Sequence, residues 1–307
     1  MKAAYFMEHG GPEVMRYGTV PDPVAGPGQV LVDVHAASVN GADWKVRAGK
    51  YAPITAFPYI PGRDFSGIVS ALGDGVKEFA IGDAVFGVCD AGQEGAYAEK
   101  IAIRSAIVAR KPERLSHAEC AALGLIGLTA LCSVEDTLQL KAGETVLIQG
   151  GAGGVAGFAL QLSRHIGARV ITTASAANHD YLRSLGADQI IDYNSQDFTR
   201  AVSGCDAVFD TAGGDVATRS FGVLRPGGRA AFIASGNAAP ASPRSDVVSL
   251  RPKVGRDRAH LERIVTLVTG GAVRVPEITL YALSQAAAAH AVSEGRHLRG
   301  KLVFKVR

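Results

Sequence analysis

The chain has few of the residues that mark several large classes of protein. Its 307 residues include four cysteines and one tryptophan. The cysteines, Cys89, Cys120, Cys132 and Cys205, lie far apart and form no C-x-x-C pair. This spacing disfavours a thiolate zinc site and predicts free thiols in a reducing compartment. We expect no metal site and expect the thiols to be buried structural groups; a disulfide or a redox-active cysteine is the alternative.

Long basic runs and long apolar runs are also missing. The net charge is only +3, and no basic run is interleaved with aromatic residues, so we do not expect nucleic acid as a partner. No apolar run approaches the roughly 20 residues that span a bilayer. The first residues, MKAAYFMEHGG, lack the apolar core of a secretory signal. We therefore expect a cytoplasmic globular protein that does not associate with a membrane.

The first 110 residues are punctuated closely by glycine and proline, and the length of the chain predicts two domains. Between these residues lie short β-like runs, which predict an irregular, mostly antiparallel β domain. The strands are expected at residues 2–6, 30–36, 67–72, 84–88 and 97–103.

The pattern changes near residue 115, where Ser116-x-x-Glu119 forms a capping box that opens the first long helix. Strands and helices then alternate, which predicts a doubly wound parallel sheet with helices on both faces. A helix is expected at 258–269 and a further one at 286–291, capped by Ser284. We expect the last strand, 301–306, to rejoin the first domain, so that the domains are 1–117 with 253–307, and 118–252 between them. The sheet strands are expected at 146–148, 169–173, 189–192, 207–210, 229–234 and 247–250.

A glycine-rich turn joins the strand at 146–148 to an apolar helix. Gly151-x-Gly153-x-x-Ala156 fits the G-x-G-x-x-G/A fingerprint of a dinucleotide-binding βαβ unit. Gly151 would permit the tight turn and Gly153 would let the backbone approach a pyrophosphate at the N-terminus of the helix. The alternative is a glycine turn that binds no phosphate.

The end of the second strand of this unit indicates which dinucleotide is bound. NAD-binding units place an Asp or Glu there to accept the ribose hydroxyls, but this chain has Thr173, Ala174 and Ser175. Since no carboxylate would repel a 2′-phosphate, NADPH is the predicted cofactor. Asn178 and His179 follow, and a histidine binds phosphate best when it is protonated.

The whole chain resembles the zinc-independent quinone oxidoreductases, the zeta-crystallin-like family of the medium-chain dehydrogenase/reductase superfamily. The likeness rests on sequence blocks that occur in order along the chain, in addition to the fingerprint. They are SVNGADWKVRAGKY (38–51), PGRDFSGIV (61–69), GDAVFG (82–87), GLTAL (127–131), SLGADQIIDY (184–193), DTAGG (210–214) and the ending at Gly300, Lys301 and Val303.

This resemblance implies a GroES-like catalytic domain, a Rossmann domain inserted into it and a homodimer. It also implies contacts of individual residues with NADPH. Gly153, Gly154 and Val155 would contact the pyrophosphate, and Thr129 the nicotinamide carboxamide. Relatives that hold the 2′-phosphate often have a lysine after the position of Ser175, where this chain has Asn178 and His179. The remaining implied contacts are made by Gly151, Ser175, Asn178, His179, Tyr193, Phe232, Ala234, Ser235 and Gly236.

The zinc-dependent alcohol dehydrogenases of the superfamily have a cysteine at the position of Asn40 and a His-Glu pair at Arg63 and Asp64. Without those ligands, reduction of a quinone or enone is expected, because such substrates are electrophilic without a Lewis acid. We expect hydride transfer from the nicotinamide to a quinone, with a proton from water. The substrate pocket would be formed by loops 48–58 and 237–246. The candidates for placing a donor near the substrate oxygen are Asn40, Lys45 and Tyr51. Asp43, in the same segment, is the fourth catalytic candidate.

Other interpretations remain open from the sequence. Asn40 could cap a loop, and Asp43 could form a structural salt bridge with Lys45. The activity could be the reduction of an alkenal or enone double bond. The chain could also be a non-catalytic NADPH-binding protein, as some members of the superfamily are lens crystallins.

Overall fold

The computed structural model describes residues 1–51, 54, 56–90, 92–296 and 298–307. The chain divides into two compact units. Unit 1 comprises Met1–Leu125, Arg256–Thr266 and Val275–Arg307, and unit 2 comprises Ile126–Gly255 and Leu267–Arg274. The boundaries expected after residues 117 and 252 stay a prediction. Residues 52, 53 and 55 of the loop expected at 48–58 lie outside the described residues.

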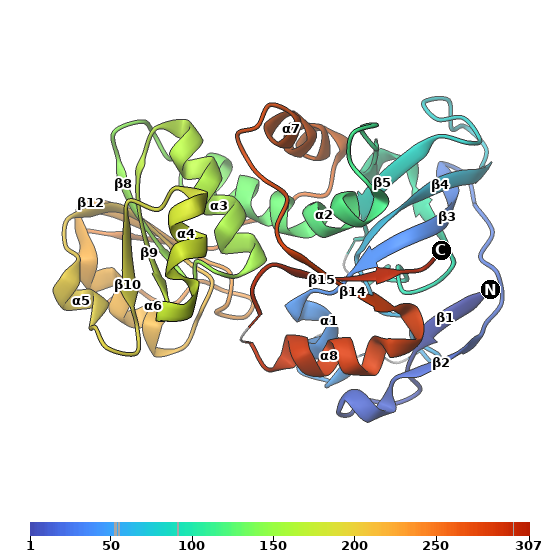
Figure 1. Cartoon of the computed structure of the whole chain (residues 1–307), viewed down its shortest axis with the longest axis horizontal. Coiled ribbons are helices and arrows are strands. Elements are labelled where there is room, and N and C mark those ends of the chain that lie inside the picture. Colours follow the sequence, from blue (N-terminus) through green and yellow to red (C-terminus); the bar gives the residue numbers. More distant parts are fainter. Residues whose placement is uncertain (52–53, 55, 91, 297) are drawn as a thin grey trace. The chain divides into compact units, whose positions relative to one another are not determined.

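Unit 1 is built mainly on a seven-stranded sheet with the order β14-β15-β3-β4-β5-β7, in which β6 also pairs with β3 (Figure 1). Its neighbours are antiparallel except for β14 and β15. The strands are β3 (Gln29–Ser38), β4 (Asp64–Leu72), β5 (Ala84–Val88), β6 (Lys100–Arg104), β7 (Val108–Arg110), β14 (Ile278–Ala282) and β15 (Lys301–Lys305), besides the separate pair β1 (Lys2–Tyr5) and β2 (Arg16–Thr19).

The core of unit 1 lies on one face of β3, where Val30, Val32 and Val34 are fully buried at every second position. This period is that of a strand with one face in the core. Burying each such valine contributes roughly 1.5–3 kcal/mol to the stability of the fold. β15 pairs with β3 in antiparallel register, with Val303 opposite Ser38. The prediction that the last strand rejoins the first domain is therefore confirmed.

The helices of unit 1 include one that the sequence analysis missed. Helix α1 (Gly41–Arg47) follows β3 directly and packs beside α8 (Ala286–Glu294) (Figure 1). The close spacing of glycines and prolines concealed this short helix. Short 3₁₀ turns complete the unit at Pro12–Val14, Ser105–Ile107 and Leu283–Gln285.

Two predicted helix starts have different outcomes. The capping box is confirmed, because the Ser116 and Glu119 side chains exchange hydrogen bonds with each other's backbone N–H groups at the start of α2 (His117–Leu131). The cap at Ser284 is wrong. Ser284 lies inside the 3₁₀ turn before α8, and the carboxamide of Gln285 instead accepts the N–H of Ala282.

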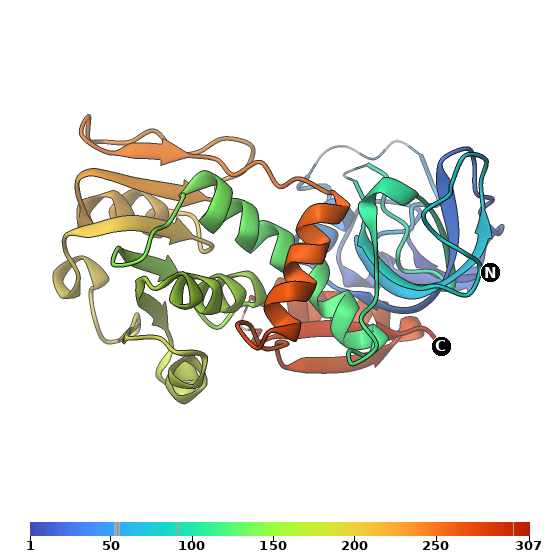
Figure 2. The same ribbon diagram turned by 90° about the horizontal axis from the view of Figure 1, so that it is seen from above.

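Unit 2 contains a six-stranded sheet with the order β10-β9-β8-β11-β12-β13, and all of its pairs are parallel. Numbered from β8, this is the order 3-2-1-4-5-6 of the Rossmann fold. The predicted doubly wound sheet is therefore confirmed. The strands are β8 (Thr145–Gln149), β9 (Arg169–Ala174), β10 (Gln189–Asp192), β11 (Cys205–Asp210), β12 (Leu224–Phe232) and the edge strand β13 (Val248–Leu250), orange in Figure 2.

Helix α3 (Gly154–Ile166) packs on β8 and β9 beside α4 (His179–Leu185) (Figure 1). Its buried residues Phe158 and Leu162 are four positions apart, which is the spacing of one helix face. The helix ends at Gly167, whose φ of 95° is the left-handed conformation that glycine adopts readily. The other helical segments are 176–178, α5 (Phe198–Ala201), α6 (Asp215–Ser220), 221–223, the π-helical turn Cys132–Thr137 and α7 (Arg258–Thr269), which crosses the boundary between the units in sequence.

One helical stretch corrects the expectation that no apolar run reaches bilayer length. His117–Thr137 has 21 residues and is apolar enough, by length and composition, to cross a membrane. However, 78% of its most apolar window is buried inside the protein, which is typical of a core helix. This stretch is therefore only weak evidence for a membrane span.

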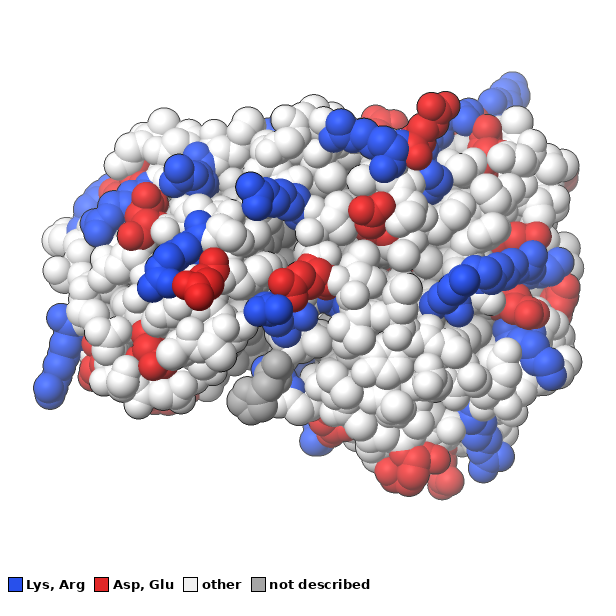
Figure 3. Space-filling view, in the orientation of Figure 1, with Lys and Arg blue, Asp and Glu red and all other residues white. Residues whose placement is uncertain are grey.

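The four cysteines are buried free thiols, as expected. Burial raises the pKa of Cys120 to about 12 and that of Cys205 to about 11, so both are protonated at neutral pH. On the face shown in Figure 3, acidic and basic side chains are interspersed and form no continuous basic surface. This distribution agrees with the small net charge.

Candidate functional site

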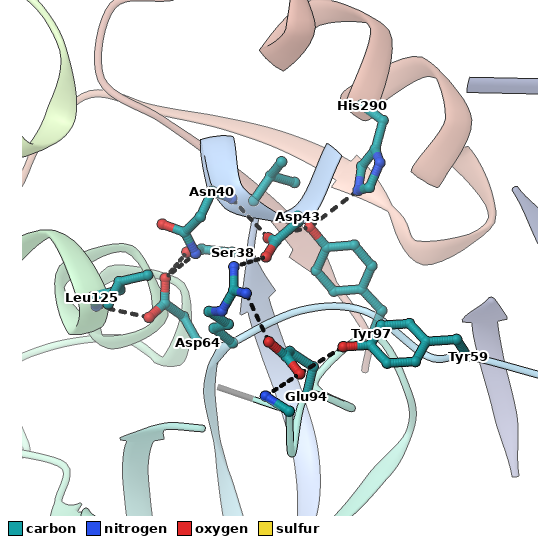
Figure 4. A network of polar contacts seen from close by, with 12 residues as sticks. Ser38, Asn40, Asp43, Tyr59, Asp64, Glu94, Tyr97, Leu125 and His290 are labelled. Carbon is teal, nitrogen blue, oxygen red and sulfur yellow. Dashed lines mark hydrogen bonds and ion pairs between the residues drawn. The ribbon is translucent and has the colours of Figure 1, made fainter. Parts of the chain in front are cut away.

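Unit 1 holds a buried polar cluster where α1, β4 and β15 meet the end of β3 (Figure 4). We use this name for a set of residues that are joined by hydrogen bonds and ion pairs. Because buried charges are costly unless they are paired, such a concentration marks a candidate functional site. The members are Ser38, Asn40, Asp43, Tyr59, Arg63, Asp64, Glu94, Tyr97, His290 and Lys301.

Asn40 lies at the start of α1, and its amide is held from both ends. The ammonium of Lys301 donates to Asn40 Oδ1 at 2.8 Å, and Asn40 Nδ2 donates to Asp64 Oδ2 at 2.7 Å. Asp64 also accepts hydrogen bonds from the hydroxyl of Ser38 and the N–H of Leu125. Asn40 thus belongs to a polar network as well as to the turn that opens α1.

Asp43 lies one helical turn further and points into the cluster. Its carboxylate accepts the N–H of Asn40 and the hydroxyl of Tyr97, and it pairs with Arg63 at 3.2 Å. Burial raises the pKa of Asp43 to about 6, although Arg63 opposes this shift. Burial also raises the pKa of Tyr97, so its hydroxyl remains a hydrogen-bond donor.

Arg63 fills the part of unit 1 between Asp43 and Glu94. Its guanidinium lies 2.7 Å from Glu94, whose other oxygen accepts the hydroxyl of Tyr59. The same guanidinium lies 5.4 Å from the ring centre of Tyr51, within the range of a cation–π contact. The arginine is therefore held by two carboxylates and faces an exposed tyrosine.

The donor set around Asn40 does not fit a zinc ion. The ammonium of Lys301 lies 3.6 Å from Asp64, and the guanidinium of Arg63 is paired with Asp43. Two fixed cations would repel a divalent metal, and neither group can serve as a ligand while it is protonated. Burial lowers the pKa of Lys301 against the opposing effect of Asp64.

The structure brings two of the four catalytic candidates together, because Asp43 accepts the backbone N–H of Asn40. The alternative salt bridge between Asp43 and Lys45 is replaced by the pair with Arg63, since residues two apart do not share a helix face. The Lys45 ammonium lies 5.8 Å from the ring of Trp44. Tyr51 joins the cluster only through its contact with Arg63.

The partners that hold these candidates, Lys301, Glu94 and Tyr97, could not be identified as site residues from the sequence. Lys301 was visible only as part of a matching block at the end of the chain. Its partner Asn40 is 261 positions away, so no local pattern could connect them.

In unit 2, the glycine turn after β8 differs in detail from the prediction. The left-handed conformation is at Gly150, with a φ of 77°, and not at Gly151. A Cβ on Gly151 would overlap the hydroxyl of Thr172, so this glycine is needed for packing against β9. A Cβ on Gly153 would meet only the carbonyl oxygen of Gly150, at 3.5 Å. The space beside Gly153 is therefore open, as the backbone approach of a phosphate requires.

Helix α3 begins directly after this turn with Gly153 as its N-cap, and no side chain caps it. Within the described part of the chain, the N–H groups of Gly154 and Val155 have no hydrogen-bond partner. Unpartnered N–H groups and the helix dipole favour an anion at this end. The turn follows β8, and the order of the sheet reverses between β8 and β11, which is where dinucleotides bind in sheets of this kind. These features fit a dinucleotide.

Ser175 follows β9, and its hydroxyl accepts a hydrogen bond from Asn178 Nδ2 at 3.1 Å. Nε2 of the neighbouring His179 is buried and has no partner among the described residues. An unpaired buried nitrogen is costly, and a ligand group would satisfy it. Of the predicted cofactor residues in this segment, Ser175 and Asn178 are thus hydrogen-bonded to each other, and His179 has an unpaired nitrogen.

The other predicted cofactor residues lie on several elements of unit 2. Thr129 is buried in α2, whereas Tyr193 is 52% exposed after β10. Phe232 is fully buried against Phe221 at the end of β12, and its carbonyl oxygen accepts a hydrogen bond from Arg251. Its side chain therefore belongs to the core of unit 2. The loop after it contains Ala234, Ser235 and Gly236, and the Ser235 hydroxyl bonds to the carbonyl oxygen of Ala238.

The raised pKa of Asp43 predicts a pH-dependent stability. Its folded pKa of about 6 exceeds the ordinary value of 3.8, so its stabilising contribution is complete below pH about 4 and lost as the pH rises through 6. Measured by urea unfolding, the wild type should lose stability relative to Asp43→Asn by about 2 kcal/mol between pH 4 and 7. A constant difference would contradict this assignment.

The chain is similar to known sequence families, to individual proteins and to solved structures. The alcohol dehydrogenase GroES-like domain matches residues 26–113, and the zinc-binding dehydrogenase family matches residues 185–304. The chain is 36% identical to 2-methylene-furan-3-one reductase of Solanum lycopersicum over 74% of its own length, and it spans 61% of that protein.

Two relatives from Arabidopsis thaliana are each 31% identical to the chain. A chloroplast envelope quinone oxidoreductase homolog matches 96% of the chain and 95% of its own length. An NADPH-dependent alkenal/one oxidoreductase matches 99% of the chain and 79% of its own length.

Two solved quinone oxidoreductase structures are similar over the full length of the chain. The structure from Coxiella burnetii has a TM-score of 0.92 at 36% identity and is covered to 99%. The Escherichia coli structure, complexed with NADPH, has a TM-score of 0.89 at 26% identity and is fully covered. With its GroES-like and Rossmann units, the chain belongs to the quinone oxidoreductase family of the medium-chain dehydrogenase/reductase superfamily.

Proposed function

We propose that this protein is an NADPH-dependent quinone oxidoreductase that transfers hydride without a metal. The observation that carries the proposal is the buried polar cluster, because its paired cations do not fit a zinc ion: Lys301 lies 3.6 Å from Asp64, and Arg63 pairs with Asp43. Asn40 is hydrogen-bonded to Asp64 and to Lys301, and Lys301 also forms an ion pair with Asp64. Arg63 forms an ion pair with Asp43. The names of relatives with quinone and alkenal substrates support the same reaction class.

When bound, NADPH would supply the hydride. The residues of unit 2 would hold it, with the N–H groups of Gly154 and Val155 on the pyrophosphate and Ser175 on the 2′-phosphate. The NADPH complex of a structurally similar quinone oxidoreductase supports this choice of cofactor. The open space at Gly153 and the unpartnered Nε2 of His179 support it from this chain's own residues.

The groups of unit 1 would act on the substrate. As hydride reaches a quinone, negative charge develops on a carbonyl oxygen, and a fixed N–H or O–H donor stabilises that charge. Asn40 can donate because its Nδ2 carries a second hydrogen. Tyr51 is exposed and can also donate, while Arg63 beneath it supplies a positive charge. Lys45 and Asp43 stay candidates, with Asp43 acting through Asn40 and Arg63.

A second candidate function is the reduction of an alkenal or enone double bond. An enone receives hydride at its β-carbon, and the charge again develops on the carbonyl oxygen, so the same donors serve both substrates. The alkenal/one oxidoreductase among the relatives favours this alternative. A non-catalytic NADPH-binding protein is the third candidate.

A steady-state screen distinguishes these functions. Purified protein is mixed with NADPH or NADH and with benzoquinones, polycyclic ortho-quinones or 2-alkenals, and absorbance at the nicotinamide band is followed. We expect NADPH oxidation with quinones. Turnover only with alkenals would support the second function, and NADPH binding without any turnover would support the third. A strong preference for NADH would contradict the cofactor assignment.

The choice of cofactor is tested at Ser175. A carboxylate in Ser175→Asp would repel the 2′-phosphate and accept ribose hydroxyls, so kcat/KM for NADPH should fall about 10- to 100-fold relative to NADH. The control is Ser203→Asp, an exposed serine of the same unit. If both variants keep the wild-type ratio of NADPH to NADH activity, Ser175 does not contact the 2′-phosphate.

We also propose a homodimer that extends the sheet of unit 2 through β13. Among the described residues, this strand pairs with β12 alone, and its Val248 is 52% exposed. An unprotected edge strand favours pairing with a second copy. Light scattering after gel filtration should give twice the chain mass of 31.8 kDa. A mass of one chain at micromolar concentration would refute the dimer.

A further inference from the structure

The amide of Asn40 is one of the most constrained polar groups in the cluster. Its Oδ1 faces the ammonium of Lys301 at 2.8 Å. Its Nδ2 faces the carboxylate of Asp64 at 2.7 Å, and Figure 4 shows this second contact. An ammonium can only donate hydrogen bonds and a carboxylate can only accept them. The two partners therefore determine which end of the amide is oxygen and which is nitrogen.

A rotation of the amide by 180° would be strongly opposed. The NH₂ group would then face an ammonium and the carbonyl oxygen would face a carboxylate. Both hydrogen bonds would be lost, and each contact would become repulsive in a site shielded from water. Asn40 thus has one allowed orientation.

The two partners are themselves held in place. Asp64 is fully buried and accepts hydrogen bonds from Ser38 and from the backbone of Leu125. Lys301 is 3% exposed and also donates to the carbonyl oxygen of Val39. Asn40 keeps 8% exposure, so solvent reaches it more than it reaches either partner.

Nδ2 of Asn40 carries two hydrogens, of which one is given to Asp64. Among the described residues, no second acceptor for Nδ2 is present. The fixed amide therefore offers one N–H to a ligand and hides its oxygen against Lys301.

We propose that Lys301 and Asp64 are positioning residues that make Asn40 present an N–H donor, and not its carbonyl oxygen, to the substrate's carbonyl oxygen. This inference rests on the proposed function, because the substrate oxygen is that of a quinone or enone. The donor stabilises the negative charge that hydride transfer places on this oxygen. A freely rotating amide would present donor and acceptor in turn.

The sharpest test exchanges the two groups in the double variant Asn40→Asp with Asp64→Asn. The new carboxylate at position 40 still accepts from Lys301, and the new amide at position 64 donates to it. The amide oxygen at position 64 still accepts the N–H of Leu125, and its nitrogen can donate to Ser38. The net charge and the number of side-chain contacts are preserved, but the group that faces the substrate changes from a donor to an acceptor.

We expect the exchanged variant to keep the melting temperature of the wild type within a few degrees and its KM for NADPH within about threefold. Its kcat for quinones should fall about 100-fold, which is the usual effect of removing one oxyanion donor. Wild-type kcat in a folded exchanged variant would overturn the proposal, because the donor would then be dispensable.

Removal of the ammonium provides a second test. Lys301→Met should lower kcat about tenfold or more because the amide can rotate, while Lys305→Met, an exposed lysine of the same strand, should keep wild-type kcat. Equal kcat in Lys301→Met and Lys305→Met, with both variants folded, would show that Lys301 does not orient the amide.

A readout independent of turnover separates this inference from the proposed function. The chain has only four asparagines, Asn40, Asn178, Asn194 and Asn237, so asparagine-selective ¹⁵N labelling gives a simple side-chain NMR spectrum. In the wild type, one Asn40 side-chain proton should be shifted downfield by Asp64 and exchange slowly, and this signature should vanish in Lys301→Met. Its presence in both proteins would refute the positioning role. A wild type with the signature but without quinone or alkenal turnover would refute only the proposed function.

Discussion

The arrangement of unit 1 depends on the pairing of buried charges between segments that are distant in sequence. Lys301 pairs with Asp64, and Arg63 is held between Asp43 and Glu94. Removing one partner of such a pair leaves an uncompensated buried charge, which costs about 3–5 kcal/mol. The junction of β3, α1, β4 and β15 is therefore fixed, and Asn40 inherits a single orientation from it.

Much of the fold could be predicted from local patterns. Alternation along β3 and the regular succession of strands and helices in unit 2 both follow from burying one face of each element. Helix α1 could not be predicted in this way, since its buried residues include Asp43 and Arg47. These polar residues turn inward because their partners come from elsewhere in the chain, and Arg47 pairs with Glu294.

The candidate site was predictable to a similar extent. In unit 2 the glycine turn could be located because its residues are adjacent in sequence. However, the left-handed residue of the turn is Gly150, and Gly151 is needed for close packing against β9. In unit 1, Asn40 and Asp43 could be singled out, but the contacts that define their chemistry join positions 20 to 261 residues apart. Local periodicity carries no information at such separations, and only the folded chain supplies it.

The insertion of unit 2 into unit 1, which is made of three segments of the chain, affects the order of folding. β15 pairs with β3 across the whole inserted unit, and Lys301 reaches Asn40 only through that pairing. During synthesis, the parallel sheet of unit 2 is complete before β15 exists, so unit 2 can fold while unit 1 still has an open edge at β3. Contacts of such large sequence separation form slowly. Lys301 is thus among the last groups to join the cluster, after the sheet of unit 2 has been synthesised.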